Sequence, residues 1–211
     1  RGPWAEKPGT AIGDVLSCRK SYVLLLTDGD YNGYPGNNRY WSQSGSLKLD
    51  SVDRLLPDGK NYSASSPESR AYQDIHNEWG NGGNRWNSIA DMAFHYWAKD
   101  LEPTLPNDIW PRIRHIGPET ITNAASSLAI PEYWNPKNDV ATWQHVTTYS
   151  IGLATAATWT GSPEFKTEGV VGNTWGGTDY KKLLLGQDGV KWINNTRQEL
   201  WHAAINSRGK F

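Results

Sequence analysis

The sequence predicts an α/β fold: one domain with a mainly parallel sheet, helices on both faces and long irregular insertions. Three segments carry this prediction. Tyr22–Leu26 is an uninterrupted apolar run, which is typical of a strand covered on both faces. Asn87–Leu101 has apolar residues at helical spacing, and His145–Leu153 is rich in β-branched and aromatic residues. A strand, a helical crossover and a second strand predict that Tyr22–Leu26 and Val146–Ile151 are parallel neighbours.

Length and composition limit the class of protein. The 211 residues suffice for one domain with a substantial core. Lys and Arg total 21 against 22 Asp and Glu, so the charge balance favours neither a nucleic-acid partner nor a polybasic membrane contact. No apolar run reaches the ~20 residues of a membrane span. Cys18 has no partner for a disulfide within the chain. Because the sequence starts at Arg1 and not at Met, we expect it to be part of a longer protein.

The two helices expected to pack on the sheet differ in their boundary signals. The first has a capping-box pattern, Ser88 to Asp91, and Pro103 beyond its end. The last helix is predicted at Asn195–Asn206, with Gly209 just after it. The first helix should bury an apolar stripe, in which Tyr96 and Trp97 are largely buried: Ile89, Met92, Ala93, Tyr96 and Trp97. The last helix should bury a second stripe: Leu200, Trp201, Ala204 and Ile205.

Long segments rich in Gly, Pro, Asn and aromatic residues separate these elements. We predict three insertions, at about residues 33–85, 104–142 and 154–193, with short strands in the first and one short helix, Pro118–Leu128, in the second. Insertions that project from strand ends are places where binding residues gather. The 12 Trp and 10 Tyr favour such recognition surfaces, although most should serve packing.

Oxygen-bearing side chains follow the first strand directly. Asp28, Asp30 and Asn32 offer carboxylate and amide oxygens, the ligands that a hard divalent cation such as calcium or magnesium takes. The same residues also suit a simple Gly-Asp turn. They match the start of an EF-hand loop, but Arg39 stands at the position that needs a bidentate Glu. With these ligands alone we expect weak calcium binding, with a dissociation constant on the order of 10⁻⁴ to 10⁻³ M.

Several common enzyme motifs are absent from the sequence. There is no G-x-S-x-G, no H-E-x-x-H, no P-loop and no G-x-G-x-x-G. The five His do not cluster at ligand spacing, so each is expected to be structural. The sequence therefore predicts no hydrolase of these classes and no nucleotide enzyme.

Four segments, in order, resemble the PilC/PilY family, large proteins at the tip of bacterial type IV pili: Cys18–Gly29, Ile89–Leu101, Trp143–Leu153 and Leu200–Gly209. The first and third are similar to the fourth and fifth strands of a von Willebrand factor A domain, a Rossmann-type fold. The resemblance implies the later part of that domain, with a β-propeller following it in the family. A-type domains hold a divalent cation with an upstream D-x-S-x-S loop, a Thr and the Asp of the T-D-G strand end. Only Asp28 carries over, because no D-x-S-x-S occurs in the sequence.

The resemblance also implies a function. It implies a non-enzymatic binding and assembly module that supports pilus biogenesis, surface adhesion and twitching motility. The expected location is extracellular, at the surface of a Gram-negative bacterium, at the pilus tip and outer membrane. Expected partners are minor pilins at the tip and a receptor on a host or abiotic surface.

The alternative is a carbohydrate-binding or carbohydrate-active extracellular domain. Trp and Tyr stack on sugars, and Asp74 and Glu78 could supply the carboxyl pair of a glycosidase. In either case we expect the first insertion to carry the recognition surface, and replacing Tyr34–Trp79 by a Gly-Ser linker to leave the core folded. The candidate recognition residues are Tyr31, Tyr34, Tyr40, Trp41 and Trp79.

Overall fold

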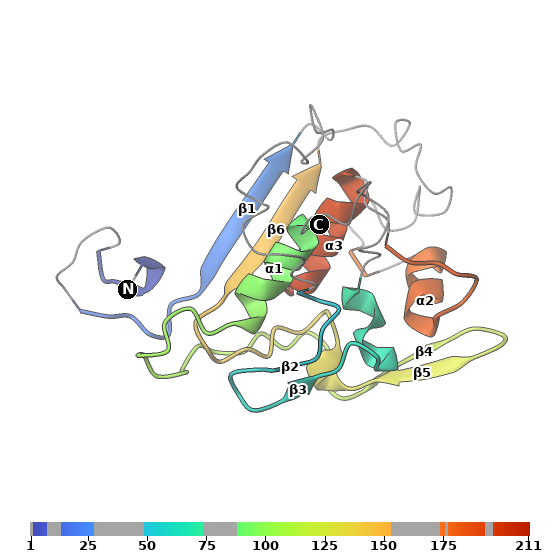
Figure 1. Cartoon of the computed structure of the whole chain (residues 1–211), viewed down its shortest axis with the longest axis horizontal. Helices are drawn as coiled ribbons and strands as arrows, with labels where there is room; N and C mark the ends of the chain where they lie inside the picture. The colour runs from blue at the N-terminus through green and yellow to red at the C-terminus, as the bar shows by residue number, and fades with distance from the viewer. Residues whose placement is uncertain are drawn as a thin grey trace, which may run out of the picture.

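The computed structural model describes residues 2–7, 14–27, 49–73, 88–152, 174–175, 177–192 and 196–211. They form a mixed α/β structure in which two helices lie beside a pair of long strands (Figure 1). The strands are β1 (Ser21–Thr27), β2 (Arg54–Leu55), β3 (Asn61–Tyr62), β4 (Glu119–Thr122), β5 (Ser127–Ile130) and β6 (Val146–Gly152). The α-helices are α1 (Ile89–Ala98), α2 (Thr178–Leu185) and α3 (Thr196–Asn206), and 3-10 turns cover Gly2–Trp4, Pro67–Tyr72 and Glu132–Trp134.

The predicted parallel pair is confirmed. β1 and β6 run parallel over their full length, from Ser21 opposite Val146 to Thr27 opposite Gly152. On its other edge β6 meets the end of the chain, where Ser150 N–H donates to the Lys210 carbonyl at 3.0 Å. Both α1 and α3 pack against β6 and against each other. Strand, crossover helix and strand thus form the centre of the fold.

The prediction that β1 is covered on both faces is wrong for the described part of the chain. Tyr22, Leu24 and Leu26 are 55%, 64% and 63% exposed, and Val23, on the opposite face, is exposed as well. The reason is that the helices pack on β6, so β1 forms the outer strand of the described sheet. The apolar run indicated a strand correctly but not its neighbours.

Helix α1 begins as predicted but buries a different face. Ser88 accepts from the Asp91 N–H, and the Asp91 carboxylate accepts from the Ser88 N–H, which confirms the capping box. Trp97 is fully buried, whereas Tyr96 is exposed and Phe94 is buried in its place. The buried face is thus Ala90, Ala93, Phe94, Trp97 and Ala98, with the Asp91 cap also buried.

Small residues explain this rotation of the helix. Ala90 and Ala93 of α1 pack against Ala203 of α3, and this contact leaves room for a close approach of the two helices. The same orientation turns Phe94 into the main core, where its ring lies 4.7 Å from that of Tyr62. The sequence-based prediction placed Tyr96 on the buried face because it weighed the hydrophobicity of side chains, and alanine has little hydrophobic surface.

Helix α3 confirms its predicted position, and its predicted stripe is buried: Leu200, Trp201, Ala204 and Ile205. The helix ends in a Schellman motif, with hydrogen bonds from Gly209 N–H to the Ala204 carbonyl and from Arg208 N–H to the Ile205 carbonyl. Arg208 takes the left-handed position, with φ of 63°, where glycine is usual. Its guanidinium lies 3.9 Å from the ring centroids of both Tyr72 and Trp97, and these cation–π contacts hold the buried Arg208 side chain in place.

The second insertion contains a hairpin where a short helix was predicted at Pro118–Leu128. Strands β4 and β5 pair antiparallel, with Glu119 opposite Ile130 and Thr122 opposite Ser127. The connecting residues fix the turn, since Asn123 Oδ1 accepts from the N–H groups of Ala125 and Ser126. The segment Glu119–Thr122 is rich in β-branched residues, and its side chains alternate in exposure as they do in a strand. This strand preference decides the structure, because the helical spacing of its apolar residues is weak. In the third insertion, the structure adds α2, which the sequence analysis did not predict.

The first insertion supplies part of the main core, so the expectation that a linker could replace Tyr34–Trp79 is wrong. Within this range residues 49–73 are described, and Leu56, Tyr62 and Tyr72 are buried in the main hydrophobic cluster. The cluster joins this insertion to α1, α2 and α3, and its members include Tyr62, Tyr72, Phe94, Trp97, Tyr180, Leu184, Trp201 and Ile205. Removing the segment would open this core rather than trim a surface loop. The predicted short strands in this insertion are present as β2 and β3.

Candidate functional site

The carboxyl ends of β1 and β6 lie at the same edge of the sheet, because the two strands are parallel. Thr27 and Gly152 end the strands opposite each other. The predicted cation ligands Asp28, Asp30 and Asn32 follow Thr27 directly, but they lie outside the described residues. The same holds for the predicted recognition residues Tyr31, Tyr34, Tyr40, Trp41 and Trp79, and for Asp74 and Glu78. Among the residues that are described, no cluster of His, Cys, Asp or Glu could hold a metal ion.

A buried histidine and aspartate lie at the start of β6. His145 Nε2 is 3.2 Å from Asp139 Oδ2, and its Nδ1 is 2.7 Å from the Trp143 carbonyl oxygen. Asp139 also accepts from Trp97 Nε1 at 3.1 Å and from the Thr147 hydroxyl at 3.3 Å. The pair of Asp139 and His145 therefore connects α1 to β6. Its polar atoms form hydrogen bonds within the protein.

Burial and hydrogen bonding act in opposite directions on Asp139. Burial opposes its ionisation, but hydrogen bonds and charge from His145, with smaller contributions from Trp97 and Arg112, hold the pKa of Asp139 below its ordinary value. A carboxyl group with a lowered pKa in the folded protein stabilises the fold at pH values above its unfolded pKa of about 3.9. This stabilisation is lost as the pH falls through the lowered pKa.

Asp139→Asn is therefore expected to lower the free energy of unfolding at pH 7 by about 1.5 to 3 kcal/mol, the range for hydrogen bonds to a charged group. The difference from the parent chain should shrink below about pH 4, where Asp139 takes up a proton in the unfolded chain, and it should vanish as the pH falls through the lowered pKa of Asp139 in the folded protein. Urea unfolding of both proteins at pH 7 and at pH 3 tests this. An unchanged difference at the two pH values would show that ionised Asp139 has no part in stability.

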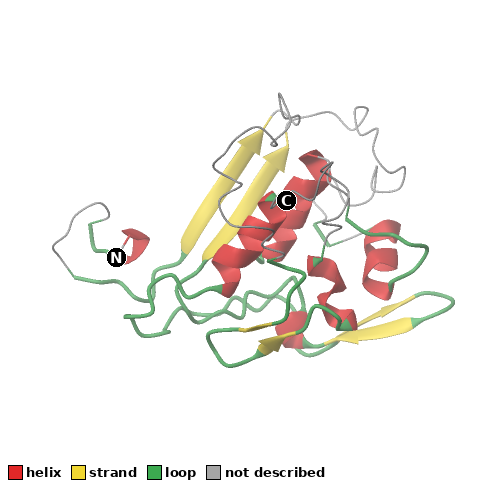
Figure 2. Ribbon diagram, in the orientation of Figure 1, coloured by secondary structure: helices red, strands yellow, loops and turns green. Residues whose placement is uncertain are grey.

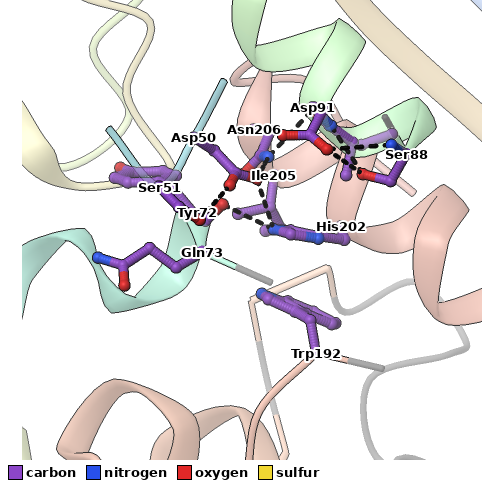
Figure 3. A network of polar contacts seen from close by, with 12 residues as sticks. Asp50, Ser51, Tyr72, Gln73, Ser88, Asp91, Trp192, His202, Ile205 and Asn206 are labelled. Atoms are coloured by element: carbon purple, nitrogen blue, oxygen red, sulfur yellow. Dashed lines mark hydrogen bonds and ion pairs between the residues drawn. The ribbon is translucent and has the colours of Figure 1, made fainter. Parts of the chain in front are cut away.

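A second buried polar network joins the first insertion to both central helices (Figure 3). Asn206 of α3 donates through its amide to Asp50 Oδ2 and to the Ala90 carbonyl of α1, both at 3.0 Å. Asp91 accepts from the Leu49 N–H at 3.1 Å. Asp50, Asp91 and Asn206 are all fully buried. The network thus fixes residues 49 and 50 against the start of α1 and the end of α3.

His202 extends this network toward the 3-10 turn at Pro67–Tyr72. Its Nε2 donates to the Tyr72 carbonyl at 2.9 Å and lies 3.9 Å from Asp50 Oδ2. Trp192 stacks on the imidazole, with ring centroids 4.8 Å apart and planes 14° apart (Figure 3). Both His145 and His202 are structural, as the sequence analysis predicted for isolated histidines. The sequence analysis did not identify Asp50 or Asn206 as functional or structural candidates. These two residues are 156 positions apart in the chain, and no local sequence pattern predicts their hydrogen bond.

Several apolar side chains on one face of the central strands are exposed. We call Tyr22, Leu24, Leu26 and Ile151 the β1 surface. Leu26 lies opposite Ile151 in the parallel register, and Leu24 lies opposite Tyr149, so these side chains share a face. The Tyr22 and Tyr149 rings meet edge to face at 5.7 Å. A contiguous apolar face of this kind marks a contact site more often than it marks a solvated surface.

Comparison with curated proteins gives relatives that match the whole chain. It is 39% identical over 217 residues to "Type IV pilus biogenesis factor PilY1" of Pseudomonas aeruginosa strain PAK, and 38% identical over 216 residues to the protein of that name from strain PAO1. The chain belongs to the PilC/PilY family. A third relative of the same name, from P. aeruginosa strain UCBPP-PA14, is 32% identical to this chain over 230 residues.

The match concerns one segment of these relatives. It covers 100% of this chain, which spans about 15% of the length of the PilY1 proteins of strains PAK and PAO1. No family model and no solved structure matches the chain. None of its described helices is long and apolar enough to cross a membrane.

Proposed function

We propose that this chain is a non-enzymatic module of a type IV pilus biogenesis factor, which acts by binding and assembly and supports surface adhesion and twitching motility. The observation that carries the proposal is the similarity of the whole chain, at 32–39% identity, to one segment of PilY1. Its partners would be minor pilins at the pilus tip and a receptor on a host or abiotic surface. Its place would be extracellular, at the pilus tip and outer membrane.

The absence of enzymatic activity is part of the proposal, and the buried polar groups support it. The network of Asp50, Asp91 and Asn206 and the pair of Asp139 and His145 are buried and bonded to groups of the protein, so they hold the fold rather than face a substrate. The alternative of a carbohydrate-active domain rests on Asp74 and Glu78, which lie outside the described residues. Hydrolysis of any glycan by the purified chain would favour that alternative.

We propose that the mixed α/β structure is a von Willebrand factor A-like domain. The parallel β1–β6 pair, joined through α1, supports it. So does the exposure of apolar side chains on both faces of β1, because parallel strands are normally buried on both faces. We propose that β1 is a central strand of the assembled protein, with a further strand at its edge and a layer of chain over the β1 surface.

Charges placed on the β1 surface should block assembly without unfolding the chain. In the double variant Leu24→Lys, Leu26→Lys, both positions are more than half exposed, so the free energy of unfolding of the purified chain should change by less than about 0.5 kcal/mol per site. In bacteria that produce the longer protein, the same variant should abolish surface pili because lysine cannot enter an apolar interface.

Leu55→Lys is the matched control, since Leu55 is 67% exposed but lies on β2, away from β1. It should leave piliation unchanged. Normal surface pili with the double variant, counted by electron microscopy, would refute the role of the β1 surface in assembly.

We also propose that any divalent cation, calcium or magnesium, binds weakly through Asp28, Asp30 and Asn32. A cation needs several oxygens at once, and these three leave most of the shell to water. Calorimetry should give a dissociation constant for calcium on the order of 10⁻⁴ to 10⁻³ M, and Asp28→Ala should remove the binding. Micromolar binding would instead indicate a complete site.

A further inference from the structure

Arg208 is a cation enclosed in the main core of the chain. Its side chain is fully buried, although the left-handed position at the end of a helix, here with φ of 63°, is usually glycine. The 3-10 turn at Pro67–Tyr72, which carries one of its aromatic neighbours, lies between α2 and α3 (Figure 2). Burying a charge without a counter-charge costs free energy, so the surroundings of Arg208 must compensate for it.

The faces of the guanidinium have neighbours within the chain, but one of its edges does not. Its central carbon lies 3.9 Å from the ring centroids of both Tyr72 and Trp97, so aromatic rings cover its faces. Nη1 lies 3.5 Å from the Ile205 carbonyl oxygen, which is a long hydrogen bond. Nε and Nη2 have no acceptor among the described residues, and no described carboxylate forms an ion pair with Arg208. These two N–H groups point the same way and form the fork that takes an anion side-on.

A buried hydroxyl on α2 adds a third donor. Tyr180 is 3% exposed, and its hydroxyl has no hydrogen-bond partner among the described residues. Burial raises the pKa of Tyr180 well above its ordinary value, so the phenol keeps its proton, and the charge of Arg208 offsets part of this rise. The hydroxyl of Tyr180 and the guanidinium of Arg208 therefore share one region of the core.

We propose that a halide ion, chloride under ordinary conditions, binds in the core between the Nε–Nη2 edge of Arg208 and the Tyr180 hydroxyl. Three donors and a positive charge require an acceptor with negative charge, and a halide ion accepts from several donors at once. A water molecule would leave the charge of Arg208 without a counter-charge. A phosphate or sulfate ion is too large for side chains that are 0% and 3% exposed in a close-packed core. The ion would join α2 to the end of α3, and this site goes beyond the proposed pilus function.

Thermal unfolding of the intact 211-residue chain over a series of sodium chloride concentrations, with sodium gluconate keeping the ionic strength constant, tests the proposal. Because the ion would bind only the folded chain, the melting temperature should rise by about 3 to 6 °C for each tenfold increase in chloride above the dissociation constant. Arg208→Lys keeps the charge but lacks the fork, so its melting temperature should not depend on chloride. Tyr180→Phe removes one donor and should need about tenfold more chloride for the same rise.

Tyr62→Phe is the matched control. Tyr62 is as buried as Tyr180, but its hydroxyl donates to the Asp50 carbonyl, so the variant should be less stable and yet respond to chloride like the parent. Crystals of the parent grown in sodium bromide should show the anomalous signal of bromide at the Nε–Nη2 edge of Arg208. A parent melting temperature that does not depend on chloride, or the same dependence in the parent and Tyr180→Phe, would overturn the proposal even if Arg208→Lys fails to fold. So would a water molecule at this edge in the bromide crystals.

Discussion

Replacing Trp97 by alanine is expected to lower the free energy of unfolding by about 3 to 5 kcal/mol, the range for loss of a buried large aromatic side chain. Trp97 is fully buried, and its ring packs edge to face on Trp143 at 5.6 Å. Its Nε1 donates to Asp139, and its face contacts the Arg208 guanidinium. The variant would leave a cavity, an unpaired acceptor and a buried cation with one aromatic neighbour fewer.

Tyr96→Ala provides the matched control on the adjacent position of α1. Tyr96 is exposed, so its truncation should change stability by no more than about 0.5 kcal/mol. Urea unfolding of the two variants beside the parent makes the comparison. Equal losses at positions 96 and 97 would mean that the buried face of α1 has been misassigned.

Gly209→Ala is expected to have the second large effect, at least about 3 kcal/mol, the upper range for overpacking a close-packed site. A methyl group on Gly209 would lie 1.8 Å from the Thr148 carbonyl oxygen, which is backbone of β6 and cannot move aside alone. Relief of this clash requires the chain end to leave β6. That movement would break the Schellman bond to Ala204 and the bond between Ser150 and Lys210.

Gly59→Ala separates this steric effect from the general cost of removing a glycine. Gly59 has φ of 84° and nothing within 4 Å of an added methyl group, so only backbone strain of about 1 to 2 kcal/mol should appear. Thermal unfolding of both variants distinguishes them. A Gly209→Ala chain that is as stable as Gly59→Ala would show that β6 and the chain end do not approach so closely.

The sequence predicted the parts of the fold whose signals are local and strong. Tyr22–Leu26 and Val146–Ile151 are continuous β-forming runs, and both became strands of the parallel pair. The caps of α1 were readable because Ser88 and Asp91 bond within one turn. Helix α3 likewise carries its own apolar residues and its terminal Gly209.

The errors arose where partners distant in sequence decide the outcome. Helix α1 buries Phe94 instead of Tyr96 because Ala90 and Ala93 pack closely against Ala203 of α3. The exposure of Leu24 depends on which strand the helices cover, which an apolar run does not encode. Pro118–Leu128 became a hairpin because Asn123 forms a turn that helical spacing could not reveal.

The candidate site shows the same division. Asp28 could be named because it ends a recognisable strand, and it remains a prediction outside the described residues. The bond between Asp50 and Asn206 could not be foreseen, since it joins parts of the chain 156 residues apart.

We propose that this chain serves pilus biogenesis through its folded core and without catalysis. The most direct test introduces Trp97→Ala into the gene that encodes this chain in its own bacterium, with Tyr96→Ala as the control, and counts surface pili by electron microscopy. We predict that pili are lost with Trp97→Ala, because the segment unfolds, and retained with Tyr96→Ala. Undiminished pili in a strain whose Trp97→Ala segment is shown to be unfolded would contradict the claim.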